Sequence, residues 1–214
     1  MRDLGLAEAE RYSHAAWDIG AEALARDLSQ RLDAPLIVAR VSRLVYDLNR
    51  PPTAPDAMPA QSGEVTVPGN RDLSQAERDA RAAEIYEPFH DALSKLLDGF
   101  DRPPAFVTIH SFTPVWNGQA RGTEIGLLHD DDARLANAML DHADPGLMTE
   151  LNAPYSARDG VTHTLRRHAI ARGLDNVMIE VRNDLLGTEA ARQRIAQVVE
   201  RMLRAALDRE DSAA

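Results

Sequence analysis

The sequence contains no cysteine and a single lysine, Lys95. Without thiols the chain has neither disulfides nor thiolate metal sites, so any metal would be held by His, Asp or Glu. Those donors suit zinc or a harder divalent cation. The other basic residues are arginines, whose planar guanidinium pairs with carboxylates in a fixed fork. This bias fits an anionic small-molecule substrate, although the coding bias of GC-rich DNA explains it equally well.

Two further absences restrict the class of protein. The sequence has no apolar run of the roughly 20 residues that a membrane-spanning helix needs. Its first residues, MRDLGLAEAERYSHAAWD, show no apolar signal core followed by a small-residue cleavage site. The formal net charge of −10 opposes binding to nucleic-acid phosphates. We therefore expect a cytoplasmic protein that binds neither nucleic acid nor membranes.

The chain's 214 residues favour a single domain, in which apolar β-branched runs alternate with stretches of helical periodicity. This alternation predicts an α/β fold, with helices on both faces of a mostly parallel or mixed sheet. Strands are expected at residues 35–41, 105–110, 123–128 and 176–182, and 42–50 has room for another. Helices are expected at about residues 6–32, 74–99, 130–142, 160–172 and 188–208.

Both kinds of periodicity disappear between residues 51 and 72, where five prolines and two glycines interrupt the chain. A loop this long in a compact domain is usually a lid, a binding loop or a disordered segment. We favour a lid that closes on the site. The capping-box spacing of Ser74 and Glu77 then marks the start of the next helix.

Two ionisable residues lie at or near the ends of predicted strands, where open α/β sheets bind their ligands. His110 closes the run AFVTIH, and Glu180 lies late in NVMIEVR. A charged group in an apolar strand costs free energy unless it is paired, exposed at the sheet edge or bound to a metal. Arg182 points to the same side of its strand as Glu180. A simple ion pair between them is therefore as good an interpretation as a catalytic role.

The remaining candidates carry weaker signals. His14 and Asp18 are four positions apart, so on a helix they would share a face and could bind a metal jointly. A solvated polar face is the better interpretation of that pair. Asn49 and Arg50 precede two prolines, in a loop that either presents a guanidinium to a carboxylate or is ordinary surface. Tyr155 lies in a loop from which it could reach a site, although loop tyrosines more often serve packing.

Taken together, a series of segments resembles the N-formylglutamate amidohydrolase family. The series spans nearly the whole chain, and SRLVYDLNRP and IHSFTP are its most specific motifs. The resemblance implies a phosphorylase/hydrolase-like fold as in zinc-dependent exopeptidases, a three-layer α/β/α sandwich around a mixed central sheet. The segments are HAAWDIGA (14–21), SRLVYDLNRPP (42–52), PGN (68–70), the pattern Glu77/Arg81/Tyr86/Pro88/His90, IHSFTP (109–114), EIGLL (124–128), NAPYS (152–156) and IEVRNDL (179–185).

The resemblance also implies a metal-dependent reaction. His110, in a His-Ser pair like that of metallocarboxypeptidases, and Asp18 would bind zinc or another divalent cation. Glu180 would be the general base. The implied reaction is hydrolysis of N-formyl-L-glutamate or another N-acyl amino acid to formate (or another acid) and the amino acid, as in histidine degradation.

Four residues would bind such a small anionic substrate by the same resemblance. Arg50 would grip a carboxylate with the help of Asn49, and Arg182 and Tyr155 complete the set. Two alternatives stay open. One is a related amidase or carboxypeptidase-like enzyme that acts on another acyl-amino acid or a peptide. The other is a metal-free binding protein with a degenerate site.

The chain departs from the family at its N-terminus. Family members normally begin with a strand that ends in a His-containing motif, a few dozen residues before the segment of His14. Either the coding start lies upstream of Met1 or one metal ligand is lost, and His14 is then a candidate substitute. A sheet that lacks this strand has an open edge, so we expect self-association into a homo-oligomer.

Overall fold

The computed structural model describes residues 3–211, which fall into two compact units. The first unit comprises the chain up to Trp17 together with Ile37–Arg102, and the second comprises Asp18–Leu36 together with the chain from Pro103. Whether the units fold as the single expected domain stays a prediction. Among the described residues, no helix is long and apolar enough to cross a membrane.

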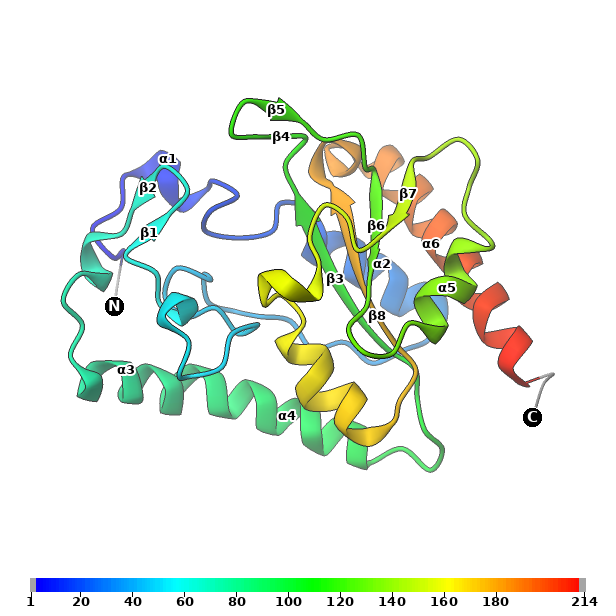
Figure 1. Cartoon of the computed structure of the whole chain (residues 1–214), viewed down its shortest axis with the longest axis horizontal. Coiled ribbons are helices and arrows are strands. Elements are labelled where there is room, and N and C mark those ends of the chain that lie inside the picture. The colour runs from blue at the N-terminus through cyan, green and yellow to red at the C-terminus, as the bar shows by residue number, and fades with distance from the viewer. Residues whose placement is uncertain (1–2, 212–214) are drawn as a thin grey trace. The chain divides into compact units, whose positions relative to one another are not determined.

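The second unit is built on a four-stranded mixed sheet, with the strand order β3-β8-β6-β7 (Figure 1). β3 and β8 are parallel, β8 and β6 antiparallel, and β6 and β7 parallel. A small hairpin of two further strands follows β3. The strands are β3 (Phe106–Phe112), β4 (Val115–Trp116), β5 (Gln119–Ala120), β6 (Ile125–Leu128), β7 (Thr149–Leu151) and β8 (Asn176–Arg182).

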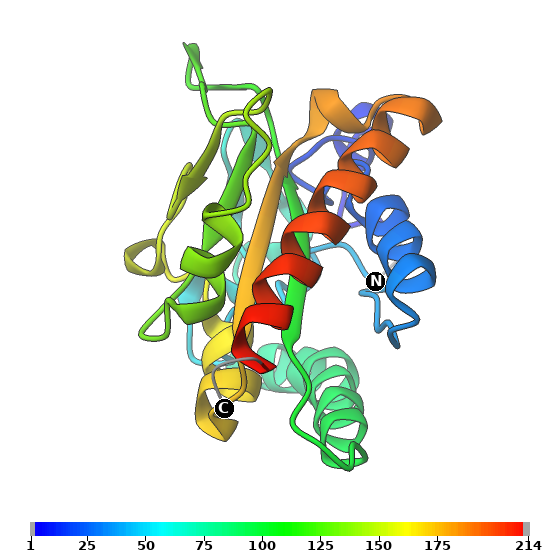
Figure 2. The same cartoon turned by 90° about the vertical axis from the view of Figure 1, so that its right-hand side faces the viewer.

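One face of this sheet is covered by α2 (Ala21–Leu32), α5 (Arg134–Leu140) and α6 (Glu189–Asp211). Alternate residues of β8 point into this layer, and Val177 and Ile179 are fully buried there. Burying a side chain of that size stabilises the fold by about 1.5–3 kcal/mol. Figure 2 shows α2 and α6 lying side by side, in agreement with the ion pairs that link the two helices.

The opposite face of the sheet carries the other alternate residues, and a π-helical turn, Leu165–Ala169, packs on it. There the ring of buried His168 lies 6.3 Å from that of Phe106 on β3. Figure 1 shows this yellow segment in front of β3 and β8. Helices on both faces of a mixed sheet confirm the predicted α/β class.

The first unit contains a long helical segment and a set of turns. The helical segment joins α3 (Gln75–Arg81), a π-helical turn and α4 (Glu87–Asp98). The predicted capping box is present, because the Ser74 amide donates to Glu77 Oε2 at 2.9 Å and the Glu77 amide donates to Ser74 Oγ at 3.3 Å. The chain leaves the helix at Gly99, as predicted.

The segment 51–72 has more local structure than a loop suggests. It holds two short 3₁₀ turns, Pro55–Ala57 and Pro68–Asn70, and a small hairpin of β1 (Gln61–Ser62) and β2 (Val65–Thr66). Buried Ala57 and Met58 join Tyr46 and Tyr86 in a hydrophobic cluster. Its role as a lid stays a prediction.

The helix predicted over residues 6–32 is wrong in its middle. A short α1 spans Glu8–Arg11, and α2 begins only at Ala21. Gly20 interrupts the helix, because it adopts a left-handed φ of 83°. A Cβ at this position would lie 2.7 Å from Leu186 Cβ, so glycine is required by both conformation and space. Helical periodicity alone does not register such a break.

The strand predicted at residues 35–41 is also absent. This segment has no strand pairing, and Leu36 and Val41 are 36% and 38% exposed. Residues 42–50 form turns rather than a second strand. Conversely, β7 was not expected, because its three residues carry no apolar alternation.

Candidate functional site

The centre of the candidate site is a row of residues across three neighbouring strands of the second unit. His110 on β3 is the register partner of Glu180 on β8, and Glu180 is also the register partner of Gly126 on β6. Register partners point to the same face of a sheet. This face, which we call the site face, is the one opposite α2, α5 and α6. The predicted proximity of His110 and Glu180 is thus observed, while their roles stay predictions.

Asp18 joins this row from the segment that leads into α2. Its Oδ2 atom lies 2.8 Å from His110 Nδ1, and both side chains are mostly buried. The neighbouring Ser111 points to the other face, where its Oγ donates to the Ile19 carbonyl at 2.8 Å. His110 and Ser111 therefore both help to fix Asp18. His110 contacts the Asp18 side chain, and Ser111 binds the backbone of the next residue, Ile19.

Glu180 occupies a protected position. It is 4% exposed, although it is a carboxylate in the middle of an apolar strand. Opposite it, Gly126 leaves room for the loop after β7. A Cβ on Gly126 would lie 1.9 Å from the Ala153 carbonyl oxygen, so only glycine allows this backbone to cross the site face.

The loop that crosses at Gly126 delivers Tyr155 to the same face. Asn152 anchors the loop, because its amide donates to the Leu127 carbonyl at 3.1 Å and its Oδ1 accepts from the His129 amide at 3.0 Å. The Tyr155 ring then lies edge-on to Phe112, with centroids 6.5 Å apart. Tyr155 therefore lies beside the carboxyl end of β3, and its role in substrate binding stays a prediction.

Arg182 ends β8 but does not form its ion pairs with Glu180. Its guanidinium contacts Glu124 at 3.2 Å and Asp184 at 2.8 Å, and it also donates to the Arg121 carbonyl at 3.2 Å. With two carboxylates around it, Arg182 ties the end of β8 to the start of β6. Binding of substrate by Arg182 stays a prediction that these ion pairs do not favour.

The remaining substrate-binding candidates lie in the first unit. Arg50 Nε is 2.7 Å from Asp56 Oδ2, and Arg50 Nη1 donates to the Asn49 carbonyl at 3.1 Å. The Asn49 amide donates to Asp47 Oδ1 at 2.9 Å, which forms a local turn. Asn49 and Arg50 are thus held by contacts within their own segment.

Motif residues elsewhere in the first unit support that segment. Arg81 donates to Asn70 Oδ1 at 2.6 Å and to the Val45 carbonyl at 3.2 Å, and His90 Nε2 lies 3.1 Å from the Leu48 carbonyl. Burial lowers the pKa of Arg81, yet guanidinium groups stay charged at neutral pH. These residues of the family pattern therefore act as a scaffold for residues 42–50.

The donor set for a metal is incomplete in the described part of the chain. Asp18 and His110 form a carboxylate–imidazole pair of the kind that binds zinc, but a catalytic zinc site ordinarily has three protein ligands. No group of three or more His, Asp or Glu side chains is placed to hold an ion among residues 3–211. His14 lies in the first unit and Asp18 in the second, and neither residue is in a helix. The prediction that the two side chains share a helical face was therefore wrong.

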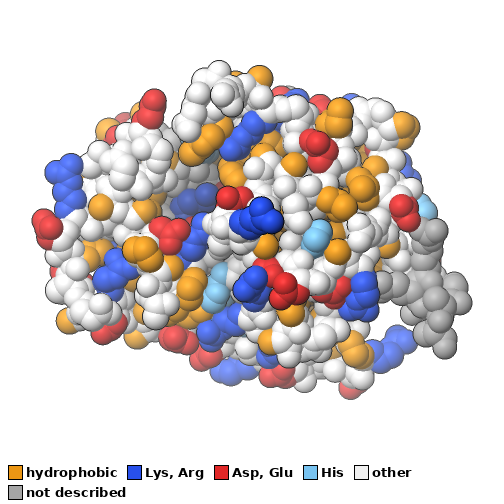
Figure 3. Space-filling model, in the orientation of Figure 1, with side chains coloured by type: hydrophobic (Ala, Val, Ile, Leu, Met, Phe, Trp, Pro, Cys, Tyr) orange, Lys and Arg blue, Asp and Glu red, His pale blue; other side chains and the backbone are white. Residues whose placement is uncertain are grey.

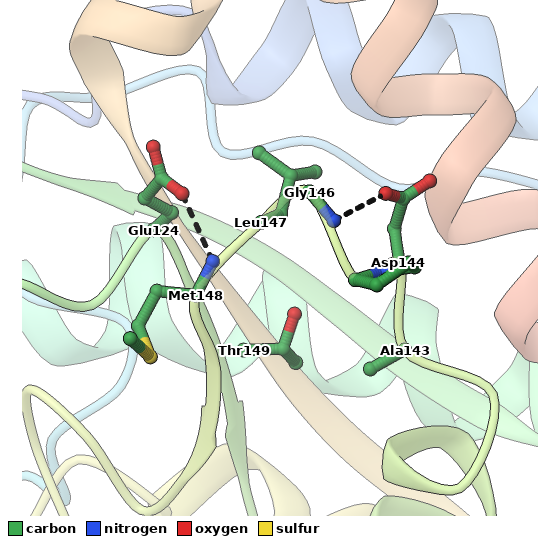
Figure 4. Close-up of a pocket in the computed structure, with 8 residues that line it drawn as sticks. Glu124, Ala143, Asp144, Gly146, Leu147, Met148 and Thr149 are labelled. Carbon is green, nitrogen blue, oxygen red and sulfur yellow. Dashed lines mark hydrogen bonds between the residues drawn. The ribbon is translucent and has the colours of Figure 1, made fainter.

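A separate shallow pocket of about 480 Å³ lies beside the loop between α5 and β7 (Figure 4). Glu124 and Asp144 line it, and each accepts a hydrogen bond from a backbone amide, from Met148 and Gly146 respectively. None of the predicted site residues lines this pocket. Two carboxylates make it a poor site for an anionic substrate.

Charged side chains of both signs lie on the surface. On the face drawn in Figure 3, Arg and Lys side chains are interspersed with Asp and Glu side chains. Surface ion pairs include Arg26 with Glu22 and Arg201 with Asp144. The absence of nucleic-acid binding stays a prediction.

Sequence reasoning missed three residues that build the site. Gly126 and Asn152 position the loop of Tyr155, and both lie inside segments of the family pattern, which was the only signal for them. The third is Arg121, which donates to the Tyr155 hydroxyl at 3.0 Å. No motif marks Arg121, because its partners are distant in the sequence.

One comparison with known proteins identifies a family. The model of the family described as N-formylglutamate amidohydrolase matches residues 1–187. The chain is 50% identical to the Agrobacterium tumefaciens gene product Atu2144, whose crystal structure superposes with a TM-score of 0.95 over 97% of this chain and 84% of that chain. No curated protein matches the chain.

A second solved structure is similar in fold. It is the N-formylglutamate amidohydrolase of Ralstonia eutropha JMP134, with a TM-score of 0.65 and 20% identity over 87% of this chain and 80% of that chain. At this identity the similarity concerns the fold alone. It supports the predicted mixed α/β/α architecture.

Proposed function

This chain belongs to the N-formylglutamate amidohydrolase family, and on that premise we propose that it hydrolyses the amide bond of an N-acyl amino acid, with N-formyl-L-glutamate as the model substrate. The products are formate and L-glutamate. The observation that carries the proposal is the register of His110 and Glu180 on β3 and β8, with Asp18 bonded to His110.

Glu180 is the general base of the proposal. It is buried on the site face beside His110, and a water molecule on that face would be within reach of its carboxylate. Glu180 takes a proton from that water as the water attacks the acyl carbon. It then returns the proton to the amine as the amide bond breaks. Proton transfer by one carboxylate thus serves both halves of the reaction.

Asp18 and His110 are the residues that would hold a divalent cation. When bound, such a cation would polarise the acyl oxygen of the substrate and lower the pKa of a coordinated water. The pair provides two of the three protein ligands that a catalytic zinc site usually has. Ser111 contributes by fixing the backbone next to Asp18.

Recognition of the substrate rests on arginine and tyrosine side chains. Arg50 with Asn49 is proposed to bind one carboxylate, as the bidentate geometry of a guanidinium favours. Tyr155 borders the site face beside Phe112. Amino-acid degradation in the cytoplasm, in particular that of histidine, is the proposed setting.

The test is an assay of the full chain with N-formyl-L-glutamate, in which released formate is measured before and after addition of zinc. Elemental analysis of the purified protein reports any bound metal. Hydrolysis that disappears with a chelator and returns with zinc supports the proposal. If N-formyl-L-glutamate stays intact with zinc present, the proposal is wrong. Turnover of other N-acyl amino acids would then favour the related amidase, and binding without turnover the metal-free binding protein.

A further inference from the structure

Arg121 lies among three aromatic rings of the second unit, just after the β4–β5 hairpin. Its guanidinium carbon is 4.9 Å from the ring centroid of Tyr155, 5.3 Å from that of Trp116 and 5.5 Å from that of Phe112. The rings come from β3, from the hairpin and from the loop after β7, so three separate segments converge on one cation. Ring contacts of this kind hold a guanidinium without neutralising its charge.

The hydrogen bonds of Arg121 use only part of its guanidinium. Nη1 donates to the Tyr155 hydroxyl at 3.0 Å and to the Thr113 carbonyl at 3.5 Å. A guanidinium has five N–H donors, and these two hydrogen bonds do not use the donors on Nε and Nη2. Within residues 3–211, no ion pair joins Arg121 to a carboxylate.

Backbone and strand geometry place Arg121 next to the site face. Phe112 lies two residues beyond His110 on β3 and therefore points to the same face. Arg182, two residues beyond Glu180 on β8, donates to the Arg121 carbonyl at 3.2 Å. Both strands that carry the proposed catalytic row thus end at Arg121.

The other arginines considered for substrate binding differ from Arg121 in one respect. Arg182 already contacts Glu124 and Asp184, and Arg50 contacts Asp56. A substrate carboxylate would have to compete with those protein carboxylates. Among the described residues, the partners of the Arg121 guanidinium are neutral: a hydroxyl, a carbonyl and aromatic rings. An incoming carboxylate would gain a charge-assisted pair there without displacing a described carboxylate.

From this geometry we propose that Arg121, held by Tyr155, binds the side-chain carboxylate of an acidic N-acyl amino acid. The inference rests on the proposed function and adds a residue that selects dicarboxylate over neutral substrates. Tyr155 is then a positioning residue, because its hydroxyl and ring orient the guanidinium.

The experiment compares N-formyl-L-glutamate with N-formyl-L-glutamine, which differ only in a carboxylate and an amide. For Arg121→Gln, kcat/KM for the glutamate compound should fall about 10- to 100-fold, the usual loss for a charge-assisted hydrogen bond. For the glutamine compound it should change less than about 3-fold. Arg121→Lys, which keeps the charge but loses the fork, should give an intermediate preference.

Arg26→Gln is the matched control, because Arg26 is an exposed arginine of the second unit that pairs with Glu22 on α2. It should leave the substrate preference unchanged. If Arg121→Gln fails to fold, Arg121→Met keeps an unbranched stem on the rings and takes its place. Equal losses for both substrates would mean that Arg121 only stabilises the hairpin, and that result overturns the inference.

Binding measured by calorimetry separates this inference from the proposed function. In a Glu180→Gln background, N-formyl-L-glutamate should bind more tightly than N-formyl-L-glutamine, and Arg121→Gln should abolish the difference. If the wild type hydrolyses neither compound yet shows this Arg121-dependent preference, the hydrolytic function fails and the carboxylate site stands. A preference that is absent, or that survives Arg121→Gln, overturns the inference regardless of turnover.

Discussion

His110 and Glu180 are register partners on the parallel strands β3 and β8, so an imidazole and a buried carboxylate leave the same face of the sheet side by side. Burying the Glu180 carboxylate costs free energy, since a charged group loses its hydration there. A sequence that only needed a stable strand would gain from an apolar residue at this position. The catalytic role of the pair stays a proposal, which the following variant tests.

Glu180→Gln should reduce hydrolysis of N-formyl-L-glutamate by about 10²- to 10⁴-fold, the usual contribution of a general base. Glutamine has nearly the same shape, so the fold should be retained, which the far-UV circular dichroism spectrum checks. Glu22→Gln on the exposed face of α2 is the control and should keep full activity. A Glu180→Gln variant with more than half of the wild-type rate would exclude Glu180 as the base.

Ser111→Ala should lower the free energy of unfolding by about 1 kcal/mol, because the Ile19 carbonyl loses its hydrogen-bond donor inside the protein. Ser29 offers a close comparison, since its Oγ also donates to a backbone carbonyl, that of Ala34 at 2.6 Å, but on the surface. Ser29→Ala should cost less than about 0.5 kcal/mol. Urea unfolding of both variants gives the two values, and equal losses would contradict the account.

The sequence was most informative for buried strands with a continuous apolar run and for a helix cap whose hydrogen bonds are local. NVMIEVR matches β8 from its first residue to its last, and AFVTIH matches most of β3. In both, residues buried on two faces leave an uninterrupted apolar run with few competing interpretations. The Ser74–Glu77 capping box was likewise predictable, because all of its hydrogen bonds are local in sequence.

Other elements could not be predicted, because long-range contacts decide them. PLIVARV has the composition of a strand, but nothing pairs with it, and periodicity does not distinguish the two cases. Gly20 packs so closely against Leu186, far along the chain, that a Cβ would not fit. Arg121 is similar, since Phe112 and Tyr155 reach it only once the sheet is formed. From the sequence, His110 and Glu180 could be placed on predicted strands, but the residues that position the neighbouring loop could not be identified.

Gly126→Ala should destabilise the second unit by about 1–3 kcal/mol, as overpacking usually does. The added Cβ would lie 1.9 Å from the Ala153 carbonyl oxygen, so the loop that carries Tyr155 must move away from the site face. Gly122→Ala is the control, because a Cβ there would have no heavy atom within 4 Å. Thermal unfolding should show a clear loss for Gly126→Ala alone. A fully stable and fully active Gly126→Ala variant would mean that the loop does not depend on this contact.

The last prediction concerns acid stability and Asp130, which follows β6. Burial by itself would raise the pKa of Asp130, but hydrogen bonds from Arg166 and Thr162 outweigh it and hold the pKa below its ordinary value. Arg166 makes two of these bonds, from Nε at 2.5 Å and from Nη2 at 2.7 Å. A carboxyl whose pKa is lower in the folded state contributes stability above its ordinary pKa. That contribution is lost as the pH falls through the folded-state value.

Asp130→Asn should therefore cost about 1–2 kcal/mol of unfolding free energy at pH 7, a range kept modest because the Arg166 side chain is 59% exposed. The difference from wild type should shrink as the pH falls below about 3.8, the ordinary value for this carboxyl. Urea unfolding between pH 7 and pH 2.5 measures both curves. Glu22→Gln, whose carboxylate is 47% exposed, should run parallel to wild type throughout. If the wild-type and Asp130→Asn curves stay equally far apart down to the lowest pH, the Asp130 carboxylate does not contribute through its charge. Its effect on stability would then come from shape and neutral hydrogen bonding alone.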